Sequence, residues 1–254
     1  MAYFVAKNSI VHQIWGKSDT VLVIFAGAAA EFALNKSVDW LFYTGQIPSD
    51  PLKRLFSTVS YARRIVFSEE KAALNAIKKI NAIHRNVENN RNSSIPARAY
   101  RDVLFMLIDY SICAFELLER RLTYSEKEDI YKVFQKVGLG MEIPNLPGNL
   151  GDWQIARKTH LKNNQVYSSF SRALFKSYRR DLGPFRYFIL TETQKMVLPS
   201  HVKKLLGYRR SFIMPSLIHA YKIGKKLRME RIFKQMILPG EYKEDILQLD
   251  ISSK

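Results

Sequence analysis

Apolar residues recur at spacings of three and four along most of the chain, and strict alternation of apolar and polar positions is rare. The first spacing indicates amphipathic helices, whereas alternation would indicate half-buried strands. We therefore predict an all-α protein. Its expected helices cover residues 7–15, 19–35, 51–67, 69–87, 98–121, 124–138, 152–161, 165–180, 184–198, 200–206 and 213–237.

Several helix ends carry local signals. Ser68 precedes two acidic residues and is expected to cap the helix that follows it. Thr123 and Glu126 have the spacing of a capping box. The polar residues 88–94 and the Gly- and Pro-rich residues 138–151 predict loops between helices.

Two segments are expected to form the centre of the fold. Residues 98–121 are apolar on nearly every face, which is typical of a buried helix. The most hydrophobic segment, 20–34, contains Glu31 and is shorter than the roughly 20 apolar residues that span a bilayer. The N-terminus also lacks the features of a signal peptide. We therefore expect a cytoplasmic protein, either soluble or peripheral to a membrane.

The chain is strongly basic, with 40 Lys and Arg against 23 Asp and Glu and a net charge of +17 over 254 residues. Such an excess indicates nucleic acid, an anionic membrane surface or acidic small molecules as partners. The basic residues are spread along the chain without a recognition-helix pattern, which disfavours nucleic acid.

The organisation expected from this pattern is a main domain over residues 1–210 and a basic segment over 211–254, packed on that domain or appended to it. Residues 217–237 form a basic amphipathic helix suited to an anionic membrane surface. The same pattern fits a helix that packs on the domain and exposes its charged face. The single cysteine, Cys113, excludes an internal disulfide and a cysteine-based zinc site, and is expected to be a buried, inert thiol.

His84 lies on the apolar face of the helix predicted over 69–87, where a histidine needs a partner. It is either a core histidine hydrogen-bonded to a carbonyl or an axial ligand of haem iron. On the preceding helix Arg54, Thr58 and Tyr61 share one face. A guanidinium there could pair with a haem propionate, and the threonine could bond a bound oxygen species. Alternatively, Arg54 is a surface residue and Thr58 fills space.

Carboxylates on the apolar helices raise a second possibility. Glu31 and Asp109 could belong to a di-iron site, but such sites usually show Glu-x-x-His pairs, which are absent here. We expect these two carboxylates to anchor Arg54 or to hold the free nitrogen of His84. The remaining histidines are scattered along the chain and are expected to lie on the surface or to have no role in a site. These are His12, His160, His201 and His219.

Several blocks of this chain, in the same order, resemble the family of MpaB and the rubber oxygenases (latex-clearing proteins), which bind haem b. The similarity extends over roughly residues 8–210. Its most recognisable block is Ser49-Asp-Pro-Leu-Lys-Arg-Leu-Phe-Ser-Thr58, followed by Ile83-His84-x-x-Val87. Later blocks are Leu122-Thr-x-Ser-Glu126, Leu146-Pro147 and Val197-Leu-Pro199.

The resemblance implies a globin-like all-α haem fold, with His84 as proximal iron ligand and Arg54 and Thr58 as pocket residues needed for activity. Two positions depart from the family pattern. Ser57 stands where latex-clearing proteins have a lysine, and Leu107-Ile-Asp109 stands where many members have Trp-Val-His.

The function that follows is a haem b-dependent oxygenase. Its expected partners are dioxygen and a hydrophobic, unsaturated substrate of terpenoid or lipid type, with oxidative cleavage or oxygenation of a carbon–carbon double bond. The alternatives are a non-catalytic haem-binding or gas-sensing protein, and a basic membrane-peripheral protein without a cofactor.

Overall fold

The computed structural model describes residues 2–42 and 51–226, with backbone alone for 51–57, 225 and 226. Its helices are α1 (Ile10–Trp15), α2 (Ser18–Leu34), η1 (Val38–Phe42, a 3₁₀ helix), α3 (Pro51–Val66), α4 (Glu70–Arg91), α5 (Ala97–Leu118), α6 (Tyr124–Gly140), α7 (Leu150–Asn164), α8 (Ser169–Val197), α9 (Ser200–Leu205) and α10 (Met214–Lys226). The described residues form one helical domain, in which β-structure is limited to two isolated bridges. The all-α prediction is confirmed.

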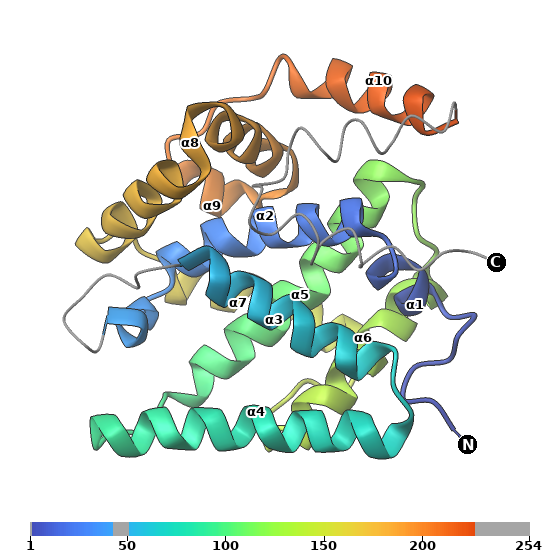
Figure 1. Ribbon diagram of the computed structural model, residues 1–254, viewed down its shortest axis with the longest axis vertical. Helices are drawn as coiled ribbons and strands as arrows, with labels where there is room; N and C mark the ends of the chain where they lie inside the picture. The colour runs from blue at the N-terminus through green and yellow to red at the C-terminus, as the bar shows by residue number, and fades with distance from the viewer. Residues whose placement is uncertain (1, 43–50, 227–254) are drawn as a thin grey trace.

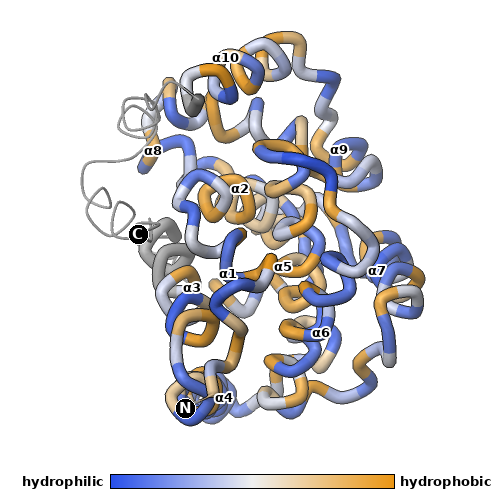
Figure 2. The backbone as a smooth tube through the Cα atoms, turned by 90° about the vertical axis from the view of Figure 1, so that its right-hand side faces the viewer, coloured by the Kyte–Doolittle hydropathy of each residue, from blue (hydrophilic) through white to orange (hydrophobic). Residues whose placement is uncertain are grey.

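Helices α2 and α5 cross at the centre of the molecule, with α8, α9 and α10 on one side and α4 at the opposite end (Figure 1). Hydrophobic residues gather along α2 and α5 (Figure 2), and most of both helices is buried. The two helices approach closely at Gly27, where an added Cβ atom would lie only 2.4 Å from the Tyr110 ring. The Ala- and Gly-rich pattern of α2 therefore brings α5 close to its backbone.

The predicted helix start at Thr123 is right for the predicted reason. Thr123 and Glu126 form a reciprocal capping box at the start of α6. The predicted break between residues 180 and 184 is a kink within α8, where Gly183 adopts a φ of 72°. Glycine tolerates this conformation, and Pro184 cannot donate a backbone hydrogen bond inside a helix.

The predicted limits of α4 are wrong at both ends. Its N-cap is Glu69 rather than Ser68, and the helix continues through the polar residues expected to form a loop. It ends at Arg91 because Asn92 takes a left-handed conformation, with a φ of 49°, which asparagine tolerates well. A polar run on an exposed helix has no apolar periodicity, so the pattern could not reveal this extension.

The C-terminal segment is described only as far as α10. Tyr221 attaches α10 to α2, because its hydroxyl donates to Asp19 Oδ2 at 2.5 Å. Residues 227–237 of the predicted basic helix lie outside the described residues. Among the helices that the structure describes, none is both long and apolar enough to cross a membrane.

Candidate functional site

An open pocket lies between α4, the start of α5 and the segment that follows α6. Its volume is about 230 Å³. Its lining residues are Asn81, His84, Arg85, Glu88, Ile95, Ala97, Tyr100, Met141, Glu142, Ile143 and Pro144. His84 is half-buried in it, and the Tyr100 ring meets the imidazole edge-on, with ring centroids 5.1 Å apart. The Nδ1 atom of His84 is buried and has no hydrogen-bond partner among the described residues.

Burial lowers the pKa of His84 below its ordinary 6.5, and the nearby charge of Glu88 offsets only part of this shift. The ring is therefore neutral at pH 7. Glu88 is held in place by the backbone N–H of Ile95, which donates to Oε1 at 2.7 Å. Burial, with a smaller contribution from Glu88, raises the pKa of Tyr100 to about 12, so its hydroxyl stays protonated.

Replacing Glu88 with glutamine is expected to lower the pKa of His84 further, because the substitution removes the one charge that favours the imidazolium. The amide oxygen of glutamine can still accept from Ile95, so the shape of the pocket is kept. Glu142→Gln is the matched control, since Glu142 also lines the pocket but does not shift this pKa. NMR titration of the imidazole resonances, assigned with a His84→Gln variant, measures the shift. An unchanged or raised pKa in Glu88→Gln would contradict this account of the pocket.

The pocket does not include the other predicted site residues that the structure describes. Thr58 is exposed and Tyr61 half-buried on α3, and neither lines the pocket around His84. Helices α3 and α4 meet at their connecting turn and diverge, so the start of α3 lies away from the end of α4 in both views (Figures 1 and 2). Arg54 lies on α3, but its side chain is outside the described part of the structure.

The apolar stripe that carries His84 was expected to face inward along the whole helix, and this is wrong for the second half of the helix. Only the first half of α4 is buried, through Ala73, Ala76 and Ile77, whereas Ile83 is an exposed residue next to His84. The apolar stripe of the helix continues beyond the part that packs against the domain. His84 therefore lies in a surface pocket instead.

The residues around His84 fit a haem iron in one respect. A neutral imidazole with an unpaired ring nitrogen is the form that ligates iron. The pocket itself is smaller than the roughly 300–1,000 Å³ of ordinary ligand sites. A macrocycle held by His84 would therefore not be enclosed by this pocket alone. Within the described residues, no group of three or more His, Cys, Asp and Glu side chains could hold a metal ion.

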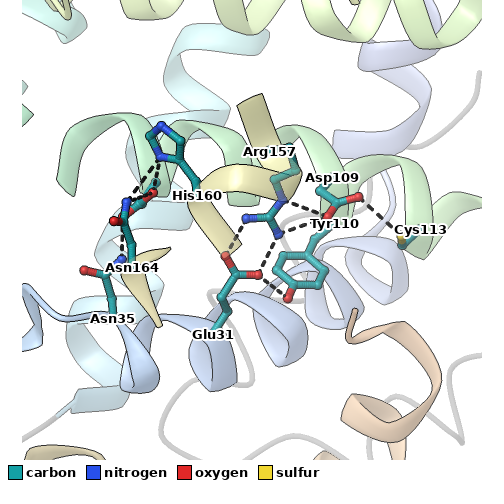
Figure 3. Close-up of polar contacts among 9 residues, drawn as sticks. Glu31, Asn35, Asp109, Tyr110, Cys113, Arg157, His160 and Asn164 are labelled. Carbon is teal, nitrogen blue, oxygen red and sulfur yellow. Dashed lines mark hydrogen bonds and ion pairs between the residues drawn. The ribbon is translucent and has the colours of Figure 1, made fainter. Parts of the chain in front are cut away.

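The most heavily buried charges lie elsewhere, where α2, α5 and α7 meet (Figure 3). Arg157 on α7 donates from Nη1 to Glu31 Oε1 at 2.5 Å and from Nη2 to Glu31 Oε2 at 2.6 Å. Its Nε donates to Asp109 Oδ2 at 3.0 Å. The hydroxyl of Tyr110 donates to Glu31 Oε2 at 2.7 Å. Both oxygens of the fully buried Glu31 are thus satisfied, as a buried charge requires.

Electrostatics favours the charged form of Arg157 in this cluster. Burial disfavours the Arg157 cation, but Glu31 and Asp109 outweigh that effect and raise its pKa above the ordinary value. Cys113 borders the cluster, with its thiol 3.8 Å from Asp109 Oδ1. Burial and then the charge of Asp109 raise the pKa of this thiol to about 12. Cys113 is therefore an unreactive thiol at neutral pH, as the sequence predicted.

The structure gives these two carboxylates a partner that was not expected. Glu31 and Asp109 pair with Arg157, and neither holds His84 within the described contacts. The side chain of Arg54 lies outside the described part of the structure, so its pairing stays a prediction. A signal for Arg157 was present in the sequence: Leu150, Trp153, Arg157 and Leu161 follow one stripe of α7, and all four are buried. An arginine on the apolar stripe of a helix needs an internal carboxylate, and Glu31 was the carboxylate without a partner.

A second polar cluster corrects the prediction for His160, which was expected to be incidental. Its Nδ1 atom lies 2.6 Å from Oδ1 of the buried Asp102. Asn35 and Asn164 also donate to this carboxylate, at 2.7 and 3.0 Å (Figure 3). The Phe105 ring packs against the imidazole at 5.0 Å. His160 thus belongs to the interior contacts of α2, α5 and α7.

Comparison with known families settles which proteins this chain resembles. The model of the catalytic domain of the "ER-bound oxygenase mpaB/B'/Rubber oxygenase" family matches residues 15–212, which is most of the chain. The chain belongs to this family. The resemblance inferred from the sequence blocks is therefore confirmed. No curated protein and no solved structure shows significant similarity to the chain. The mpaB/rubber-oxygenase match includes α2 to α9, with the His84 pocket and both polar clusters, and ends before α10.

Proposed function

We propose that the protein is a haem b-dependent oxygenase that acts on a hydrophobic, unsaturated substrate of terpenoid or lipid type. The observation that carries this proposal is the match of the oxygenase family's catalytic domain to residues 15–212. The neutral, unpaired imidazole of His84 supports it from the structure. The haem iron, when bound, would supply the activation of dioxygen.

The protein's own residues would bind and orient. His84 would ligate the iron through a ring nitrogen, and Tyr100 would fix the tilt of that ring by its edge contact. Arg54 would pair with a carboxylate of the cofactor. The planar guanidinium of an arginine matches a carboxylate better than an ammonium group does. Thr58 and Tyr61 lie on the same helix but do not line the pocket around His84, so their role beside the cofactor rests on the family resemblance alone.

The test is to express the full chain with haem supplementation and to record its oxidised and reduced absorption spectra, with pyridine haemochrome and iron assays. Dioxygen uptake is then measured with an unsaturated isoprenoid and with its saturated analogue as control. We expect a haem b signature and uptake with the unsaturated compound only. A colourless, iron-free protein would refute haem dependence. A haem-loaded protein that consumes no dioxygen with any unsaturated substrate would indicate a haem-binding or gas-sensing role.

The variants Arg54→Ala and Thr58→Ala test the binding of haem separately from the uptake of dioxygen. Because each removes one orienting group and leaves His84 in place, we expect the haem content to be kept and dioxygen uptake to fall about 10²-fold, the scale of an oriented reacting group. Ser60→Ala, an exposed position on the same helix, is the matched control. Wild-type uptake in both variants would contradict the proposed role of this face of α3.

A further inference from the structure

Helices α8 and α10 lie at the end of the molecule opposite α4 (Figures 1 and 2), and this end exposes aromatic side chains. It is built from the half of α8 that follows the kink at Gly183, the linker 206–213 and α10. Phe212 is 87% exposed and Ile213 52% exposed on the linker. The other exposed large apolar residues of this end are Phe185, Phe188, Leu217 and Ile223. A concentration of such residues at one place indicates an interaction surface.

Partly buried hydrogen bonds attach the linker to α8. Ser211 donates its hydroxyl to the buried carboxylate of Glu192, and Lys195 donates to the same carboxylate. Tyr208 donates to Gln194 Oε1 at 2.9 Å. Glu192 lies one helical turn after Phe188, so the linker crosses α8 close to that phenylalanine. Phe212 and Phe188 therefore stand on the same part of the surface, on a fixed backbone.

The stretch of residues 176–213, which includes the last turns of α8 before the kink, is almost entirely positive in charge. Its basic residues between positions 176 and 213 are Lys176, Arg179, Arg180, Arg186, Lys195, Lys203, Lys204, Arg209 and Arg210. The two acidic residues in the same stretch are already paired, Asp181 with Arg180 and Glu192 with Lys195. Arg209 and Arg210 are both exposed and immediately precede the exposed Phe212 and Ile213. The surface complements a partner that is anionic and offers an apolar layer.

We propose that this end, defined by residues 185–188 and 209–217, docks peripherally on the surface of an anionic phospholipid bilayer. Phe212 and Ile213 enter the boundary between headgroups and acyl chains, and Arg209 and Arg210 bind lipid phosphates. Projecting aromatic side chains next to arginines suit this boundary, where apolar groups are buried and cations are attracted at the same time. A nucleic acid backbone would use the arginines but offers no layer in which Phe212 can be buried. The inference does not depend on the oxygenase activity.

The test is flotation of the full chain with phosphatidylcholine vesicles, with and without phosphatidylserine, at low and high salt. Phe212→Ser/Ile213→Ser removes the apolar pair, and Arg209→Gln/Arg210→Gln removes the two charges. Ile155→Ser is the apolar control, because Ile155 is 69% exposed on α7. Lys78→Gln/Lys79→Gln is the charge control, with the same loss of two charges from exposed positions on α4 at the other end.

The expected result is salt-sensitive binding to the anionic vesicles only, weakened about tenfold or more by each of the two site variants and kept by both controls. Equal circular dichroism and thermal unfolding check that all variants fold. Three results would overturn the proposal: no binding of the wild type to anionic vesicles, wild-type affinity in the site variants, or an equal loss in the α4 control. Self-association that depends on Phe212 and Ile213, without vesicle binding, would assign the surface to a second copy of this chain instead.

Discussion

Replacing Arg157 with methionine is expected to lower the free energy of unfolding by about 3–5 kcal/mol, the usual cost of removing one partner from a buried ion pair. The methionine fills most of the volume but leaves Glu31 fully buried, with the Tyr110 hydroxyl as its remaining side-chain partner. Asp109 loses its cation at the same time, although it is partly exposed and can be hydrated. The loss therefore comes chiefly from Glu31.

Urea unfolding followed by circular dichroism measures this change. Arg180→Met is the matched control, because Arg180 pairs with Asp181 at an exposed site and its removal is expected to change the free energy of unfolding little. The double variant Glu31→Gln/Arg157→Met is expected to be less destabilised than the sum of its two single variants, since the buried charge is gone. Equal, small losses for Arg157→Met and Arg180→Met would contradict the buried cluster.

The helices could be predicted from the sequence because the information that specifies them is local. The capping box of Thr123 and Glu126 and the break at Gly183 and Pro184 each depend on residues within one turn of each other. The end of α4 was missed because its last turns are polar and exposed, so no periodic apolar position marks them. Local signals therefore define the start of a helix better than a polar, solvent-exposed end.

The interior polar contacts could not be predicted in the same way. Glu31 and Arg157 are 126 positions apart, and Asp102 and His160 are 58 apart, so their pairing depends on how α2, α5 and α7 meet. The sequence identified the carboxylates as unusual but did not identify Arg157 as their partner. Arg157 is a cation on the apolar stripe of α7. A search for charged residues on all apolar stripes would have paired this cation with a buried carboxylate.

The buried clusters and the His84 pocket differ in how fully their polar atoms are satisfied. Glu31, Asp109 and Arg157 satisfy one another, and Asp102 is satisfied by three donors, so these groups hold α2, α5 and α7 together. His84 differs because its buried Nδ1 atom lacks a hydrogen bond within the described residues. Unsatisfied buried polar atoms are uncommon and call for an explanation, which a ligand would provide.

His84→Ala is expected to reduce the haem content from about one per chain to near zero, because in the proposed site the His84 imidazole would be the ligand by which the protein holds the iron. His219→Ala is the matched control, since His219 is exposed on α10 and far from the pocket. Haem content is measured by pyridine haemochrome and by iron analysis of the purified full chain. Addition of free imidazole to His84→Ala should restore part of the wild-type spectrum, which a merely misfolded variant would not do.

The protonation of His84 is also expected to make haem binding depend on pH. The imidazole must be neutral to bind iron, and burial lowers its pKa below the ordinary 6.5. Protons therefore compete with iron only when the pH falls below that value, and haem should be retained at pH 6.5 and released on further acidification. Spectra recorded as a function of pH measure this release. Full haem content in His84→Ala, or release already above pH 7, would remove His84 from the proposed site and direct the search for the ligand to α3.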